Sequence, residues 1–152
     1  MKTELIVVLD MDTRKEALAA VTACETCDGF KIGAQLFTRL GPSIVRDVQK
    51  REKKVFLDLK YHDIPNTVAR AAEGAMQIGA SMFNVHALGG RKMMEETVSS
   101  VQRKAAATGK TAPRIFSVAS MNISYLSSPA PKAKRPASST RTAPLPVFWS
   151  RC

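Results

Sequence analysis

Short apolar runs recur along the first two thirds of the chain with nearly constant spacing. They start at Leu5, Gly29, Val55 and Met82, so the intervals are 24, 26 and 27 residues. Segments with apolar residues at helical spacing separate these runs. This alternation predicts a chain of βα units whose strands form a parallel sheet.

The segments between the strands also carry signals for the starts of helices. Thr13 followed three residues later by Glu16 has the spacing of a capping box. Pro42 and Pro65 suit the first turn of a helix. We therefore expect helices that open at Thr13 and that span about 42–50, 65–78 and 90–107.

Polar residues that a plain core would avoid occur toward the end of every predicted strand. In chain order they are Asp10, Lys31, Asp58 with Lys60, and Asn84 with His86. In a closed (β/α)₈ barrel the catalytic residues come from the carboxyl ends of several strands. The pattern thus predicts an α/β fold of the TIM-barrel family. A flavodoxin-like open sheet is the alternative, although its sites draw on fewer strands.

The third predicted strand has the most informative polar residues. Residues two apart in a strand face the same side, so Asp58 and Lys60 should project together, and Asp63 follows along the next turn. The apolar run 55–59 indicates a strand covered on both faces. Because buried charges need partners, we interpret these three residues as functional.

Composition divides the chain near residue 113. All 13 acidic residues precede residue 114, whereas the following 39 residues hold 6 of the 23 basic residues and 5 of the 8 prolines. We predict a partial barrel domain at 1–113 and an irregular, Pro/Ser-rich basic tail at 114–152. The basic run 132–135 is interpreted as a solvated, non-specific segment and not as a nucleic-acid site.

The remaining patterns predict a cytoplasmic protein without a membrane span or a zinc site. The apolar run from Leu5 ends after five residues at Asp10, too short for a signal peptide or a span. Cys24 and Cys27 lack a second Cys/His pair that would complete a zinc site, so reduced thiols are expected.

The string from Asp58 to Thr67, Asp-Leu-Lys-Tyr-His-Asp-Ile-Pro-Asn-Thr, resembles bacterial orotidine 5′-phosphate decarboxylase. Leu9-Asp10, the segment 30–33 (Phe-Lys-Ile-Gly) and the segment 84–87 (Asn-Val-His-Ala) are similar to the same family, over about residues 4–113. The resemblance implies decarboxylation of orotidine 5′-phosphate to uridine 5′-phosphate, the last step of pyrimidine nucleotide synthesis, without cofactor or metal.

The resemblance also implies roles for individual residues. Lys60 is the general acid that protonates the pyrimidine carbon, and Asp58 lies beside the departing carboxylate. Asp63 crosses the interface of a homodimer into the partner's site. The residues implied in substrate binding are Asp10, Lys31, Ile64 and Thr67.

The chain departs from this family in its second half. A complete barrel takes at least about 200 residues, so we expect an incomplete barrel of four to five βα units. The resemblance places the phosphate-binding part, including an arginine, in the absent half. We hypothesise a reading-frame change or truncation near residue 114, which we expect to impair the activity of this chain.

Two alternatives remain. One is a magnesium-dependent phosphosugar barrel, such as hexulose-phosphate synthase, which is similar in its Asp-x-Lys-x-x-Asp signature. The other is a non-catalytic fragment with a basic tail that binds nucleic acid. The segment 64–67, Ile-Pro-Asn-Thr, favours the orotidine enzyme.

Overall fold

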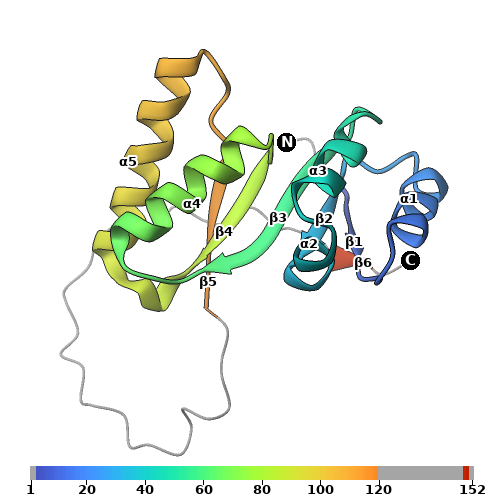
Figure 1. Ribbon diagram of the computed structural model, residues 1–152, viewed down its shortest axis with the longest axis horizontal. Helices are drawn as coiled ribbons and strands as arrows, with labels where there is room; N and C mark the ends of the chain where they lie inside the picture. Colours follow the sequence, from blue (N-terminus) through green and yellow to red (C-terminus); the bar gives the residue numbers. More distant parts are fainter. Residues whose placement is uncertain (1–2, 120–148, 151–152) are drawn as a thin grey trace, which may run out of the picture.

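The computed structural model describes residues 3–119 and 149–150 of the chain (Figure 1). Strands and helices alternate along most of this part. The strands are β1 (Ile6–Leu9), β2 (Gly29–Gly33), β3 (Lys54–Tyr61), β4 (Met82–His86), β5 (Arg114–Val118) and β6 (Trp149–Ser150). The helices are α1 (Arg14–Ala23), α2 (Ala34–Leu40), α3 (Pro42–Gln49), α4 (Pro65–Gln77), the short 3₁₀ helix η1 (Ala87–Gly89) and α5 (Gly90–Thr108).

The strands form one parallel sheet in the order β5-β4-β3-β2-β1-β6. Strands β1 to β5 therefore lie side by side in chain order. In a flavodoxin-like sheet the order of the strands would reverse at a switch point, although all strands stay parallel. The consecutive order is that of a barrel wall, and the described strands cover part of such a wall.

Local signals placed most helices correctly. Thr13 and Glu16 form the predicted capping box, in which the Thr13 hydroxyl accepts from the Glu16 N–H at 3.2 Å and the Thr13 N–H donates to the Glu16 carboxylate at 3.2 Å. Pro42 and Pro65 are the first residues of α3 and α4. Helix α2 was not predicted, because its seven residues are too few for a clear period.

Regular structure extends past the predicted boundary at residue 113. Arg114–Val118 forms β5 and pairs with β4, with Ile115 opposite Phe83. The loss of acidic residues at residue 114 marks a change in composition. It does not mark the end of the sheet, because a short strand can pair with β4 without acidic residues. The rest of the expected tail, 120–148 and 151–152, lies outside the described residues.

The helices cover one face of the sheet. Along each strand, alternate side chains point to this face and form the main core, with Phe30, Leu57 and Phe83 fully buried. Helices α4 and α5 pack against each other next to β4 (Figure 1). The core therefore lies between strands and helices, as in the outer layer of a barrel.

The other face of the sheet carries no helix among the described elements. It has an apolar zone toward the amino ends of the strands and a polar zone toward their carboxyl ends. Toward the amino ends of the strands, Ile6, Phe56, Met82 and Phe116 form a second apolar cluster. The rings of Phe56 and Phe116 lie 5.5 Å apart although β4 separates their strands. Adjacent strands are about 4.8 Å apart, so these rings converge over β4 on a concave face, as in a barrel interior.

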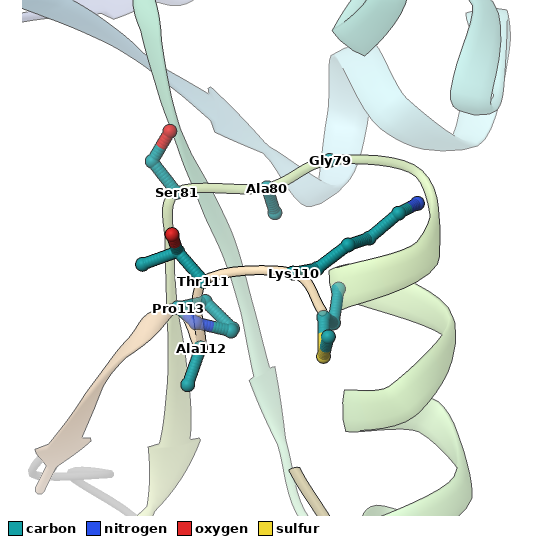
Figure 2. A pocket seen from close by; sticks show the side chains of 8 residues that line it. Gly79, Ala80, Ser81, Lys110, Thr111, Ala112 and Pro113 are labelled. Atoms are coloured by element: carbon teal, nitrogen blue, oxygen red, sulfur yellow. The ribbon is translucent and has the colours of Figure 1, made fainter. Parts of the chain in front are cut away.

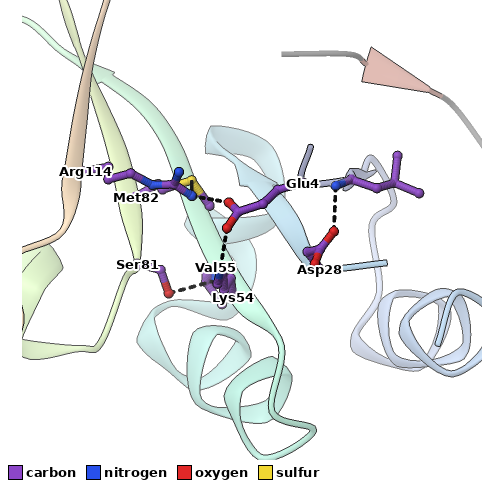
Figure 3. A network of polar contacts seen from close by, with 8 residues as sticks. Glu4, Asp28, Lys54, Val55, Ser81, Met82 and Arg114 are labelled. Carbon is purple, nitrogen blue, oxygen red and sulfur yellow. Dashed lines mark hydrogen bonds and ion pairs between the residues drawn. The ribbon is translucent and has the colours of Figure 1, made fainter. Parts of the chain in front are cut away.

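Glu4 links three strands at their amino ends (Figure 3). Its carboxylate accepts hydrogen bonds from Lys54 of β3 and Arg114 of β5, and the chain then enters β1. These bonds lower the pKa of Glu4 from 4.5 to about 2. Glu4 thus connects the first described strand with the fifth across the concave face.

Glu4→Gln is expected to lower the free energy of unfolding by about 1 kcal/mol at pH 7, the upper range for partly exposed ion pairs. Because the folded-state pKa is lowered, this stabilisation is present above pH 4.5 and is lost as the pH falls toward about 2. Urea unfolding at pH 7 and pH 3 measures it. Glu95→Gln, which removes only an exposed helical pair with Arg91, is the matched control.

Candidate active site

An irregularity in β3 shapes the carboxyl edge of the sheet. Leu57 pairs with Phe83 and Tyr61 with Val85, so three residues of β3 (58–60) lie opposite the single residue Asn84 of β4. Within this bulge Lys60 has a φ of 49°, the left-handed region that side chains other than glycine seldom adopt. The bulge thus redirects the last charged residue of β3.

Asp58 is the centre of the polar zone on the concave face. One carboxylate oxygen, Oδ2, accepts from Lys31 Nζ at 2.6 Å. The other, Oδ1, accepts from Lys60 Nζ at 2.7 Å and from Asn84 Nδ2 at 2.6 Å. Side chains from the three neighbouring strands β2, β3 and β4 therefore donate hydrogen bonds to one carboxylate.

The ionisation of Asp58 follows from these contacts. Burial of the residue, which is 7% exposed, raises its pKa, but hydrogen bonds from Lys31, Lys60 and Asn84 outweigh burial and lower the pKa from 3.8 to about 2. Asp58 is therefore a carboxylate at neutral pH. The Lys60 side chain is 47% exposed and can reach a bound molecule, whereas that of Lys31 is 18% exposed.

The structure does not bring the other predicted residues into this cluster. Asp10 is exposed just beyond β1, and Ile64 and Thr67 are exposed where α4 begins. Asp63 is exposed too, and its carboxylate accepts from the Ile64 N–H at 2.6 Å. Within residues 3–119, Asp63 forms no ion pair with Lys60. All four follow the carboxyl ends of strands β1 or β3, and none of them forms a hydrogen bond or ion pair with the cluster within residues 3–119.

Asn84 was not predicted as a site residue, although its side chain completes the cluster. The signal available in the sequence was an amide within an apolar strand, which suggests a buried polar group with specific partners. Nearby, the rings of His62 and His86 stack at 4.9 Å, at the ends of β3 and β4. The His86 ring also accepts from the Leu88 N–H at 3.3 Å.

A pocket of about 360 Å³ lies at the other end of the strands (Figure 2). The turns before β4 and β5 line it, with Gly79, Ala80 and Ser81 on one side and 110–113 on the other. Catalytic sites of barrels lie at the carboxyl edge, so this pocket has no part in the site around Asp58.

The described residues contain neither a cluster suited to a metal ion nor a membrane-spanning helix. No group of three or more His, Cys, Asp or Glu side chains among them is placed to hold a metal ion. None of the helices in 3–119 is long and apolar enough to cross a membrane.

A parallel wall of consecutive βα units, with charged residues gathered at its carboxyl edge, defines a TIM-barrel type of α/β protein. The profile of the orotidine 5′-phosphate decarboxylase / HUMPS family matches residues 3–126. The chain belongs to this family. The matched residues include β5, so this strand belongs to the same domain as β1 to β4, with which it shares the sheet.

Named relatives and solved structures agree with this assignment. The chain is 57% identical over 89 residues to orotidine 5′-phosphate decarboxylase of Syntrophus aciditrophicus, covering 59% of this chain and 36% of that protein. It is 45% identical over 120 residues to the enzyme of Legionella pneumophila, covering 78% and 50%. The crystal structure of the Lactobacillus acidophilus enzyme superposes with a TM-score of 0.65 at 31% identity, covering 76% and 52%. The chain thus spans between about a third and a half of the length of these relatives.

Proposed function

We propose that this chain carries the proton-transfer part of an orotidine 5′-phosphate decarboxylase site. The observation that supports this most directly is the Asp58 carboxylate held between the Lys31 and Lys60 ammonium groups at 2.6 and 2.7 Å. A fixed cationic donor beside a carboxylate is what protonation of a carbon centre requires. The relatives named above carry this activity in their names.

The reaction breaks the bond between the pyrimidine carbon and its carboxylate, and carbon dioxide leaves. The electron pair of the broken bond stays on the ring carbon. Lys60 Nζ–H then donates its proton to that carbon and becomes a neutral amine. Asp58 holds the Lys60 ammonium in place through Oδ1 and faces the departing carboxylate of the substrate. Lys31 donates to the other oxygen of Asp58, Oδ2. Preorganised charges of this kind stabilise charge that develops during the reaction.

The remaining predicted residues contact substrate in this proposal. Asp10, Ile64 and Thr67 are exposed at the carboxyl edge and free of the Asp58 cluster, so they are available to the ribose and the base. The resemblance attributes the phosphate contacts to the second half of the barrel, whereas the match to the Legionella pneumophila enzyme covers 50% of that protein. We therefore expect weak binding of the substrate by this chain alone.

The name of the family also includes HUMPS enzymes. A magnesium-dependent sugar phosphate reaction, such as that of hexulose-phosphate synthase, is therefore the second candidate. In the structure both Asp58 oxygens accept hydrogen bonds from ammonium groups, an arrangement that favours the cofactor-free reaction over coordination of a cation. The names of the curated relatives favour it too.

Release of labelled carbon dioxide from orotidine 5′-phosphate tests the proposed function. With protein in excess over substrate, we expect release above the uncatalysed rate, unchanged by EDTA. Loss of this release with EDTA and its return with Mg²⁺ would contradict the cofactor-free reaction. No release at any protein concentration would overturn the proposal for this chain.

We also propose that the chain forms a homodimer in which Asp63 serves the partner's site. Its exposure and its separation from Lys60 within one chain support this arrangement. In a two-fold dimer each site then combines Lys60 of one chain with Asp63 of the other.

Mixing two inactive variants tests this sharing. Lys60→Ala mixed in equal amounts with Asp63→Asn should recover about one quarter of the wild-type activity, because half of the dimers are mixed and each contains one intact site. Recovery should require dissociation and reassociation of the dimers. Asp63→Asn with wild-type activity, or no recovery on mixing, would contradict the shared site.

A further inference from the structure

The backbone of Lys60 has an unusual conformation, and the charge of its side chain does not explain it. Its φ of 49° lies in the left-handed region, where the Cβ of a lysine crowds the backbone. Such a conformation persists only when surrounding contacts determine it. The ion pair with Asp58 involves the far end of a flexible side chain, so it cannot set the backbone. Another group must hold the bulge.

Asn84 makes the contacts that hold it. In a regular ladder a strand N–H pairs with a carbonyl of the neighbouring backbone, but the Lys60 N–H donates to the side-chain oxygen of Asn84 at 2.7 Å. The amide nitrogen of the same side chain donates to Asp58 Oδ1 at 2.6 Å. One side chain therefore connects the first and last residues of the bulge.

Burial makes this connection specific. Asn84 is 2% exposed, so an amide that lost either partner would be a buried polar group without a hydrogen bond. Met82 and His86 flank it on the same face of β4. Its oxygen is directed to the Lys60 backbone and its nitrogen to Asp58, so both ends of the amide act on residues of the bulge.

We propose that Asn84 is a positioning residue that holds the β3 bulge in the conformation that places the Lys60 ammonium on Asp58. The contacts of Asn84 stand on the geometry, and the consequence for catalysis rests on the proposed function of Lys60. Asn84 acts through its two neighbours and is not itself a catalytic residue.

Two variants separate the two hydrogen bonds of Asn84. Asn84→Ala removes both, so the Lys60 backbone N–H should exchange with solvent about tenfold faster, the change that a lost hydrogen bond of ordinary strength produces. Asn84→Asp keeps an oxygen for the Lys60 N–H but faces Asp58 with a second carboxylate. Its Lys60 N–H should keep nearly wild-type exchange, while the pKa of Asp58 rises.

Nuclear magnetic resonance measures both effects on the whole chain, through amide exchange and through the pH titration of the Asp58 carboxyl carbon. The Leu57 N–H, in the regular part of β3, should not change. Asn66→Ala is the matched control, because Asn66 is an exposed asparagine whose side chain accepts only a 3.4 Å bond from Arg70.

The outcomes decide between positioning and other roles. Unchanged Lys60 exchange in Asn84→Ala overturns the proposal, whether or not the chain decarboxylates. Unfolding of both variants overturns it as well, because Asn84 would then be needed for the fold in general. If the exchange and titration shifts occur but carbon dioxide release is absent in the wild type, the proposed function fails and the positioning of the bulge stands.

Discussion

Lys60→Ala is expected to reduce the release of carbon dioxide from orotidine 5′-phosphate by about 10²- to 10⁴-fold, the contribution of a positioned general acid. The variant loses the proton that the ring carbon receives. Its fold should change little, because the Lys60 side chain is 47% exposed and its departure leaves Asp58 paired with Lys31. The rate of a single turnover with protein in excess measures the effect.

Lys60→Arg distinguishes a proton donor from a positive charge. Arginine keeps the charge beside Asp58, but a guanidinium does not give up its proton in proteins. We therefore expect Lys60→Arg to be as inactive as Lys60→Ala. Lys50→Ala, at a side chain that is 78% exposed on the helical side, should keep wild-type activity. An active Lys60→Arg variant would show that charge alone suffices and would remove the proton-transfer role.

The sequence predicted the elements well because their signals are local. Short apolar runs at nearly constant spacing placed β1 to β4, and the cap at Thr13 and the prolines at 42 and 65 placed the starts of three helices. Asp58 and Lys60 were predicted to meet because they are two residues apart in a strand. They do meet, at 2.7 Å, but through a bulge and a left-handed Lys60 that alternation alone cannot reveal.

The parts that the sequence did not predict depend on pairing between distant segments. The role of Asn84 follows from its register opposite residues 58–60, which only the assembled sheet defines. The contact of Glu4 with Arg114 joins residues 110 positions apart, and no local pattern marks it. Such contacts arise from curvature of the sheet, which brings β1 and β5 toward each other across the concave face.

Asp58→Ala should have the largest effect on stability. Removing one partner of a buried ion pair typically lowers the free energy of unfolding by about 3–5 kcal/mol. We expect about 3 kcal/mol here, at the lower end of that range, because the half-exposed Lys60 can turn to solvent, whereas the more buried Lys31 and Asn84 lose the Asp58 carboxylate as an acceptor. Decarboxylation should also be lost, since no carboxylate then orients Lys60.

The dependence of this effect on pH identifies its cause. The pKa of Asp58 is about 2 in the folded chain and 3.8 as the ordinary value, so its stabilisation is complete above pH 3.8 and is lost as the pH falls through about 2. The difference between wild type and Asp58→Ala in urea unfolding should therefore shrink between pH 7 and pH 3. Asp47→Ala, which removes pairs with the more exposed Arg14 and Lys50, should cost about 1 kcal/mol or less. An equal loss from both variants would mean that the Asp58 cluster contributes no more than a surface ion pair.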